Sequence, residues 1–340
     1  MFPIVLRLLI LSLLLIAGAL SLAGGGPARA LAYLEDVPQA GRRVAHRPYM
    51  LDLSRGMAHR LAAEPIAMPY FGFHYTTWSP DQGRVAYGYE VFGLYLADTT
   101  GNTLQHFPGT ELIAQQPMWS PDGSAIAYGA RRPIGGEAVY LMVVDLETGR
   151  IRRIAEGLKL FQPILWSSDS QYLYYVDTQQ ALWSVRADGA ASPRRLAESV
   201  YSPALAPDGS QIVFASPEGG DFDLYRMDAD GGQLRSLTTT PTFDSLPLWS
   251  ADGRWIAFIS DRDDVRRLYV MHPDGSEAHP IYPAGGTQGM PMWSPEGALL
   301  LFGAYENDHW ISYIAEIEKG IVRPAGFNYL TGFAPVWMNG

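Results

Sequence analysis

The sequence contains no cysteine. This absence excludes disulfide bonds, thiol catalysis, cysteine-ligated zinc and a lipid-modified N-terminal cysteine. Basic residues are also scarce, because 25 Lys and Arg stand against 35 Asp and Glu, for a formal net charge of −10. Nucleic-acid-binding domains need a basic face to displace counterions, so we expect no nucleic-acid partner.

Catalytic motifs are missing as well. The chain has no G-x-S-x-G nucleophile turn, no H-E-x-x-H zinc motif and no phosphate-binding loop. The histidines are not grouped at metal-ligand spacing; they are His46, His59, His74, His106, His272, His279 and His309. The sequence therefore favours a non-enzymatic protein without a cofactor.

Long hydrophobic runs are absent except for one near the N-terminus. Residues 8–23 carry no charge, follow Arg7 and end at a Gly-Gly-Gly-Pro break over 24–27. A signal peptide has a core of ~7–15 apolar residues and a spanning helix needs ~20, so the run falls between the two. We predict that residues 1–30 are a signal peptide or an uncleaved N-terminal hydrophobic helix that contacts the membrane. Residues 31–340 are then exported, to the periplasm or the extracellular space.

What the sequence has is turn residues and a repeat. The 35 Gly, 25 Pro and 47% apolar residues favour a folded, turn-rich β architecture. A strand ends in Trp, or once in Leu, and in most copies a Ser-Pro-Asp-Gly turn or a close variant follows. The copies are Trp78, Trp119, Trp166, Leu205, Trp249, Trp293 and Trp337, spaced 41, 47, 39, 44, 44 and 44 residues apart. A period near ~40–45 residues is that of a four-stranded propeller blade.

The repeat predicts an all-β fold, a seven-bladed β-propeller of four-stranded antiparallel blades over residues 31–340. Segments before the first Trp match a second strand at Ala30–Tyr33, a third at Tyr49–Asp52 and a fourth at Ala58–Leu61. The C-terminus carries a spare first strand at Phe333–Trp337. We expect this strand to join the N-terminal blade and close the ring; six blades is the alternative. The repeated Trp should fill the wedge between neighbouring blades.

These residues resemble the TolB-type propeller repeat, also called the WD40-like or PD40 repeat, whose hallmark is W-S-P-D-G before an apolar strand. The resemblance covers about residues 30–340. Proteins with this repeat include TolB of the Tol-Pal system, prolyl-oligopeptidase-like peptidases and some lyases. From the position of the repeats we expect no counterpart of the separate α/β domain that precedes the propeller in TolB, and none of the hydrolase domain that follows it in the peptidases.

Two acidic clusters lie between second and third strands, at Asp261–Asp264 and at Asp221 and Asp223. We interpret them as solvated turn residues; a Ca²⁺ site is the less favoured alternative, because neither has the spacing of a calcium loop.

The predicted ligand site is the mouth of the central channel. First strands should line the axis, so residues three to five places before each repeat Trp or Leu should lie at its entrance. They are His74, Tyr75, Gln115, Gln116, Gln162, Tyr201, Ser202, Asp244, Ser245 and Gln288. This mostly neutral hydrogen-bonding set suits a polar polymer or a protein segment, although ordinary solvated loop residues would look the same.

Three functions remain open. The first is a binding or scaffold propeller that presents this mouth to a protein or polymer partner. The second is a polysaccharide lyase or hydrolase that uses His74 and Asp244 at the axis, with or without a divalent ion. The third is a component of an envelope complex, as the TolB resemblance implies.

Overall fold

The computed structural model describes residues 30–39, 43–52, 57–60, 66–67, 74–89, 93–98, 103–110, 113–131, 138–282, 286–325 and 336–338. Within this part the regular secondary structure is almost entirely β-strand, with one short 3₁₀ helix, η2 (Ile317–Lys319). The predicted N-terminal hydrophobic segment lies outside the described residues. Among the described residues, which begin at Ala30, no helix combines the length and apolar character needed to span a bilayer.

Six antiparallel sheets follow one another along the chain. The first two comprise β5 (His74–Trp78), β6 (Arg84–Tyr89), β7 (Gly93–Asp98) and β8 (Thr103–Phe107), then β9 (Met118–Trp119), β10 (Ala125–Arg131), β11 (Val139–Asp145) and β12 (Ile151–Glu156). The next two comprise β13 (Leu165–Trp166), β14 (Tyr172–Val176), β15 (Leu182–Arg186) and β16 (Arg194–Ala197), then β17 (Tyr201–Leu205), β18 (Gln211–Ser216), β19 (Asp223–Asp228) and β20 (Arg235–Ser236). The last two comprise β21 (Asp244–Trp249), β22 (Ile256–Ser260), β23 (Arg267–Met271) and β24 (His279–Pro280), then β25 (Gln288–Trp293), β26 (Leu299–Glu306), β27 (His309–Glu316) and β28 (Ile321–Pro324).

A further sheet takes strands from both ends of the chain. It contains β1 (Ala30–Gln39), β2 (Arg43–Asp52), β3 (Met57–Arg60), β4 (Ile66–Ala67) and β29 (Val336–Met338). β29 pairs antiparallel with β1, with Leu31 opposite Trp337 and Ala32 opposite Val336. The C-terminal strand thus joins the N-terminal sheet, at the segment where the repeat predicts it.

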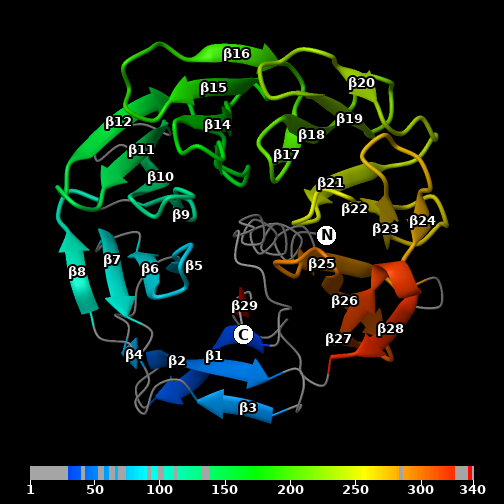
Figure 1. Cartoon of the computed structure of the whole chain (residues 1–340), viewed down its shortest axis with the longest axis horizontal. Coiled ribbons are helices and arrows are strands. Elements are labelled where there is room, and N and C mark those ends of the chain that lie inside the picture. Colours follow the sequence, from blue (N-terminus) through cyan, green and yellow to red (C-terminus); the bar gives the residue numbers. More distant parts are fainter. Residues whose placement is uncertain are drawn as a thin grey trace.

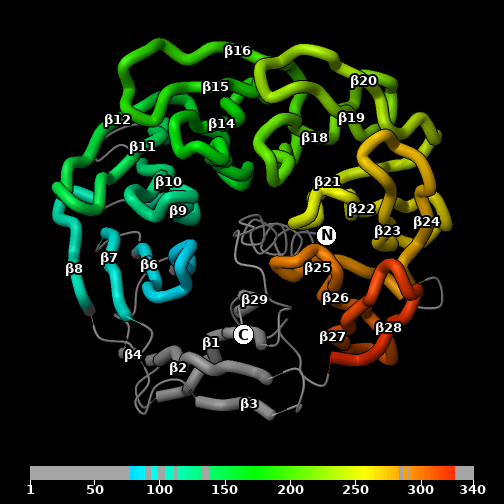
Figure 2. The backbone as a smooth tube through the Cα atoms, in the orientation of Figure 1, coloured from blue at the N-terminus to red at the C-terminus, as the bar shows by residue number. Residues whose placement is uncertain are grey.

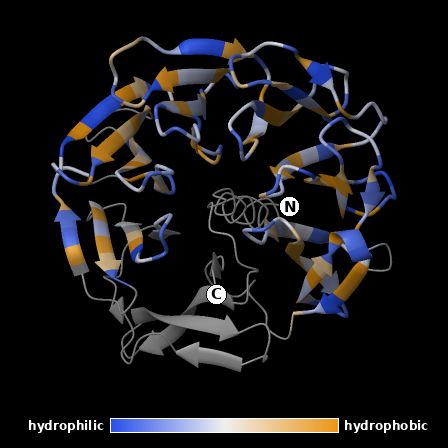
Figure 3. Cartoon of the chain, in the orientation of Figure 1, coloured by the Kyte–Doolittle hydropathy of each residue, from blue (hydrophilic) through white to orange (hydrophobic). Residues whose placement is uncertain are grey.

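The sheets stand around a central axis, which makes the molecule an all-β propeller (Figure 1). In each of the six sheets built from consecutive strands, the chain begins at the innermost strand and moves outward strand by strand (Figure 2). The middle strands are buried on both faces, as β22 shows along its whole length, because a sheet packs on each side of them. The outermost strands are more hydrophilic (Figure 3).

The repeated Trp fills the space between consecutive sheets, as predicted. Trp166 packs among residues of the preceding sheet, including Leu141 and Val143. Its indole N–H donates to the carbonyl of Met118 (3.1 Å), directly before the preceding repeat Trp. Trp119 donates in the same way to Thr77 (3.2 Å) and Trp293 to Leu248 (3.2 Å). Each of these rings therefore supplies both apolar area and a hydrogen bond across the seam between two sheets.

The turn after the Trp is held by a repeated pair of side chains. In one copy the Ser167 hydroxyl donates to Asp169 (2.5 Å) and accepts the N–H of Tyr172 (2.8 Å). The same carboxylate accepts the N–H of Gln171 (3.0 Å). The hydrogen bond from Ser167, followed by that from Gln171, holds the pKa of Asp169 below its usual value. The ionised carboxylate is thus part of the turn.

We expect Trp166→Phe to lower the free energy of unfolding by about 1–3 kcal/mol, since it removes a buried hydrogen bond and leaves space at the seam. Trp249→Phe is the matched control. The two rings are similarly buried, 7% and 8% exposed, but the Trp249 indole N–H has no acceptor among the described residues. Urea denaturation should find the smaller loss in Trp249→Phe; equal losses would show that the hydrogen bond contributes nothing.

We expect Asp169→Asn to destabilise the protein by about 0.5–1 kcal/mol at neutral pH, since a charged acceptor holds the turn more tightly than a neutral one. Because the folded-state pKa is lowered, this stabilisation is present above the ordinary Asp pKa and is lost as the pH falls through the lower folded value. Melting curves of wild type and variant should converge in acid. A difference in melting temperature between wild type and variant that increased in acid would contradict the role given to the ionised Asp169 carboxylate.

Candidate functional site

The predicted mouth residues sit at or just before the starts of the innermost strands, but their side chains do different things. His74 and Tyr75 begin β5, opposite Tyr89 and Gly88; their side chains lie outside the part that the structure describes. Four side chains are buried: Gln115, Asp244, Ser245 and Gln288. The remaining four are half-buried: Gln116, Gln162, Tyr201 and Ser202.

The buried glutamines are used inside the protein. Gln288 Oε1 accepts the backbone N–H of Leu268 (3.1 Å), and its Nε2 donates to the carbonyl of Tyr282 (2.6 Å). Gln115 Nε2 donates to the carbonyl of Gln162 in the next sheet, while Gln162 Oε1 accepts the N–H of Ser202 in the sheet after that (2.7 Å). These contacts link consecutive inner strands around the axis.

A backbone hydrogen bond explains why the residue five places before the repeat Trp or Leu lies against the neighbouring sheet. The N–H five residues before the repeat Trp or Leu donates to a carbonyl just before the third strand of the preceding sheet. The pairs are Val200 to Gln180 (2.8 Å), Asp244 to Phe222 (2.7 Å) and Gln288 to Arg266 (2.8 Å). The start of each of these strands is thereby drawn against its neighbour, so that the side chains of Asp244 and Gln288 are enclosed between sheets.

The inner strands also contain a β-bulge that the repeat pattern does not predict. The register shifts between Tyr201 and Ala204 in β17 and between Ser245 and Leu248 in β21. Within these shifts Ser202 has φ +48° and Leu246 has φ +54°. Side chains other than glycine rarely occupy this left-handed region, and such residues often mark sites where the backbone serves a function.

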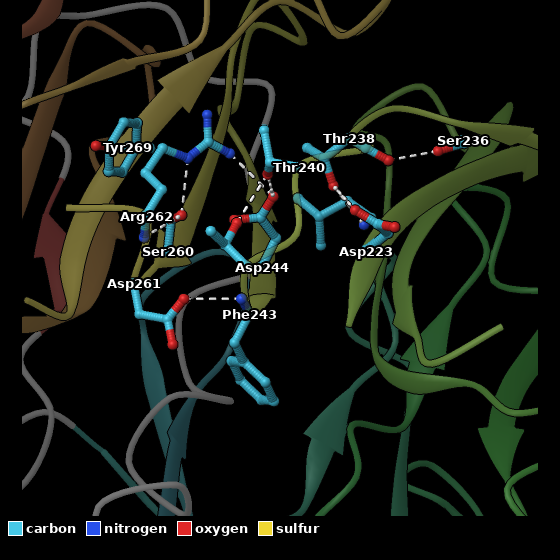
Figure 4. A network of polar contacts seen from close by, with 12 residues as sticks. Asp223, Ser236, Thr238, Thr240, Phe243, Asp244, Ser260, Asp261, Arg262 and Tyr269 are labelled. Atoms are coloured by element: carbon cyan, nitrogen blue, oxygen red, sulfur yellow. Dashed lines mark hydrogen bonds and ion pairs between the residues drawn. The ribbon is translucent and has the colours of Figure 1, made fainter. Parts of the chain in front are cut away.

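An ion pair joins β21 to the loop after β22, next to the seam with the β17–β20 sheet (Figure 4). Asp244, with a 0% exposed side chain, accepts from Arg262 Nη2 through Oδ2 (2.9 Å). Arg262 Nε donates to the Ser260 hydroxyl (2.9 Å), and its guanidinium stacks on the ring of Tyr269, 4.7 Å from its centroid. Asp244 Oδ1 has no hydrogen-bond partner among the described residues.

The interpretation of Asp223 as a solvated turn residue is wrong, whereas Asp221 and Asp261 are exposed as expected. Asp223 begins β19, is buried, and accepts from the Thr238 hydroxyl (3.0 Å). Burial raises its pKa, and the charges of Asp244 and Asp221 add to the shift. Burial is thus the main cost of ionising Asp223, and the neighbouring carboxylates add to that cost.

A second group of hydrogen-bonding side chains lies on the other side of Arg262. The Tyr269 hydroxyl donates to Asp263 Oδ2, which also accepts from Arg267 Nη1 (3.0 Å). Burial, followed by the hydrogen bond to Asp263, raises the pKa of Tyr269 to about 12. Tyr269 thus remains a neutral donor at physiological pH, and both Arg262 and Arg267 are held by acidic partners.

Sequence reasoning missed a row of three aromatic rings beside this network. Tyr201 and Phe222 meet edge to face with centroids 5.0 Å apart, and Phe222 and Phe243 lie 4.8 Å apart. Phe243 is 44% exposed, and Phe161, directly before Gln162, is 37% exposed. Both precede an inner strand, so a search of those positions for aromatic side chains would have found them.

No group of three or more metal-ligating side chains occurs in the described part of the chain. The histidines with described side chains are His106 on β8, His272 directly after β23, His279 on β24 and His309 on β27, each on or beside a middle or outer strand. They do not come together at the axis.

We expect Arg262→Met to lower the free energy of unfolding by about 3–5 kcal/mol, because it leaves the Asp244 carboxylate buried without its cation. The double variant Arg262→Met with Asp244→Asn should recover much of this loss, since the unpaired charge is then gone. Chemical denaturation of both variants measures the difference. An Arg262→Met variant as stable as wild type would show that the ion pair does not stabilise the fold.

Comparison with known proteins agrees with this architecture. Residues 164–323 match the family described as TolB beta propeller domain, PD40. The chain is 30% identical over 213 residues to the Tol-Pal system protein TolB of Anaeromyxobacter dehalogenans, covering 62% of this chain and 39% of that protein. It is also 30% identical over 177 residues to an uncharacterised protein of Agrobacterium fabrum, covering 47% of this chain and 59% of the relative. The matches thus span only about two fifths to three fifths of these relatives.

Two solved structures share the fold at low sequence identity. A puromycin-hydrolysing peptidase of Mycobacterium tuberculosis has a TM-score of 0.67 at 15% identity, over 92% of this chain and 54% of the peptidase. An oligogalacturonate lyase in complex with manganese has a TM-score of 0.60 at 17% identity, over 88% of this chain and 95% of the lyase. The repeat, the sheets around an axis and these matches together support a TolB-like PD40 propeller.

Proposed function

We propose that this protein is an exported binding propeller that holds a segment of a protein or polymer partner at the mouth of its axis, as a component of an envelope complex. The observation that carries the proposal is the exposure of aromatic rings in the segments that lead into inner strands, at Phe161 and Phe243. Exposed rings beside hydrogen-bonding side chains are typical of binding surfaces. The similarity to a Tol-Pal system protein favours a partner in the cell envelope.

The proposed architecture is a ring of seven blades over residues 31–340, with residues 1–30 as the export signal or membrane anchor. The sheet that contains β1 and β29 supports closure of the ring by the two ends of the chain. Such closure leaves no open sheet edge between the first and last blades. The mouth would then be a fixed opening rather than a gap between two ends.

Within the predicted mouth set we assign two roles. His74, Tyr75, Gln116, Gln162, Tyr201 and Ser202 are the proposed ligand contacts. Gln115, Asp244, Ser245 and Gln288 are buried and are proposed to fix the inner strands that present those contacts.

We do not carry forward a general acid–base pair of His74 and Asp244. A general base must reach the proton it removes. Asp244 is enclosed and already accepts from Arg262, so using it as a base would require breaking this buried ion pair. The likeness to the lyase concerns the fold alone.

A photo-crosslinker placed in the full chain tests the mouth. We expect p-benzoylphenylalanine at Phe161 to form a discrete adduct with an envelope component of the source organism. The same group at Tyr172, which is 39% exposed after a Ser-x-Asp turn at the opposite end of its sheet, is the control and should form none. Mass spectrometry of the adducts reads out the result. Equal labelling at both positions, or none at Phe161, would contradict a binding role for the mouth.

A further inference from the structure

The aromatic row, defined as Tyr201, Phe222 and Phe243, crosses the seam between the β17–β20 and β21–β24 sheets. Consecutive ring centroids are 5.0 and 4.8 Å apart, so the rings form one continuous apolar strip. Exposure rises along it, from half-buried Tyr201 and Phe222 to Phe243 at 44%. The Phe243 ring points away from the contact between Asp244 and Arg262 (Figure 4). One end of the strip is thus open to a partner.

Exposed carboxylates lie on the loops at both sides of the row. Glu218 and Asp221 precede Phe222, and Asp261 and Asp264 follow β22. Asp261 is fixed beside the row, because its Oδ1 accepts the backbone N–H of Phe243 (2.8 Å). In the described part of the chain none of these four carboxylates forms an ion pair with a basic side chain.

The basic side chains nearby do not offset this charge. Arg262 is bound to Asp244 and stacked on Tyr269, and Arg267 is bound to Asp263. Arg266, the remaining cation of the loop, is half-buried and close enough to Asp261 to interact with its charge. The surface beside the row is therefore left with a net negative charge, on a protein that is itself acidic.

We propose that the aromatic row and its flanking carboxylates bind an extended protein segment in which Arg or Lys alternates with apolar or aromatic residues. The inference rests on the proposed function, because it names the chemistry of the partner that the mouth would hold. The partner's apolar side chains would pack along the strip. A guanidinium could stack on the open face of Phe243 while it pairs with Asp221 or Asp261, so the same side chain gains a cation–π contact and a charge-assisted hydrogen bond.

Fluorescence anisotropy on the full chain tests this with three labelled synthetic peptides of equal length. One alternates Arg with Trp and Pro, the second has Glu in place of Arg, and the third has Gln. We expect the Arg peptide to bind and the Glu peptide not to bind. Raising the salt from about 50 to about 500 mM should weaken the Arg peptide markedly, because exposed charges are screened.

Variants of the row separate this site from general charge attraction. We expect Phe243→Ala to weaken the Arg peptide about tenfold through loss of packing and stacking. The double variant Asp221→Asn with Asp261→Asn should weaken it comparably and flatten the salt dependence. Leu234→Ala, an apolar change at a 49% exposed position beside β20, and Glu147→Gln, an exposed carboxylate in the turn between β11 and β12, are matched controls that should bind as wild type. Thermal melting confirms that each variant is folded.

Two results would overturn the proposal: equal binding of the Glu and Arg peptides, or binding of the Arg peptide that neither row variant changes. Failure of this inference can be told apart from failure of the proposed function. Crosslinking at Phe161 to a partner without a basic segment would support the binding mouth and contradict this inference. Binding of the Arg peptide to the row without any adduct at Phe161 would support this inference and contradict the binding mouth.

Discussion

The hydrogen bond from a tryptophan indole to a main-chain carbonyl of the preceding sheet is the interaction on which the ring depends. A four-stranded sheet that is apolar on both faces cannot be stable alone, because both faces must be covered. The indole covers one face with a wide ring and pairs its only polar group with a main-chain carbonyl of the preceding sheet. The contact recurs at Trp119, Trp166 and Trp293, and there it holds each sheet against the one before it.

Departures from this contact coincide with the unusual features of the molecule. The sheet β17–β20 has Leu205 in place of the Trp, and the ring of Trp249 that packs on it has no acceptor for its indole N–H among the described residues. At that same seam lie the buried ion pair of Asp244 and Arg262, the left-handed residues Ser202 and Leu246, and the aromatic row. Where the repeat lacks its Trp, side chains outside the repeat pattern pack at the seam.

The sequence predicted the fold in considerable detail because its signals are local and repeated. A strand ending in Trp and a turn of Ser, Pro, Asp and Gly have fixed spacing, so strand order and the pairing of β29 with β1 followed from counting. Side-chain roles at the mouth followed less well. Asp244 lies near the predicted entrance, yet a backbone hydrogen bond to Phe222 draws it into the seam. Likewise, Asp223 is in a loop-like acidic pattern but is buried by Thr238 and its neighbours. Such outcomes depend on contacts between sheets, which a single repeat does not encode.

The pairing of Leu31 with Trp337 makes strands at opposite ends of the chain neighbours within one sheet. In the proposed closed ring, the blades have an order around a circle but no structural beginning. The peptide backbone could accordingly be rejoined across β29 and β1 and opened at a surface turn elsewhere, such as the one at Gly149, to give a circular permutant with the same seams. Such a rearrangement would change how many residues separate the two sheets that form the last seam. It would therefore change the entropy that is lost when the ring closes.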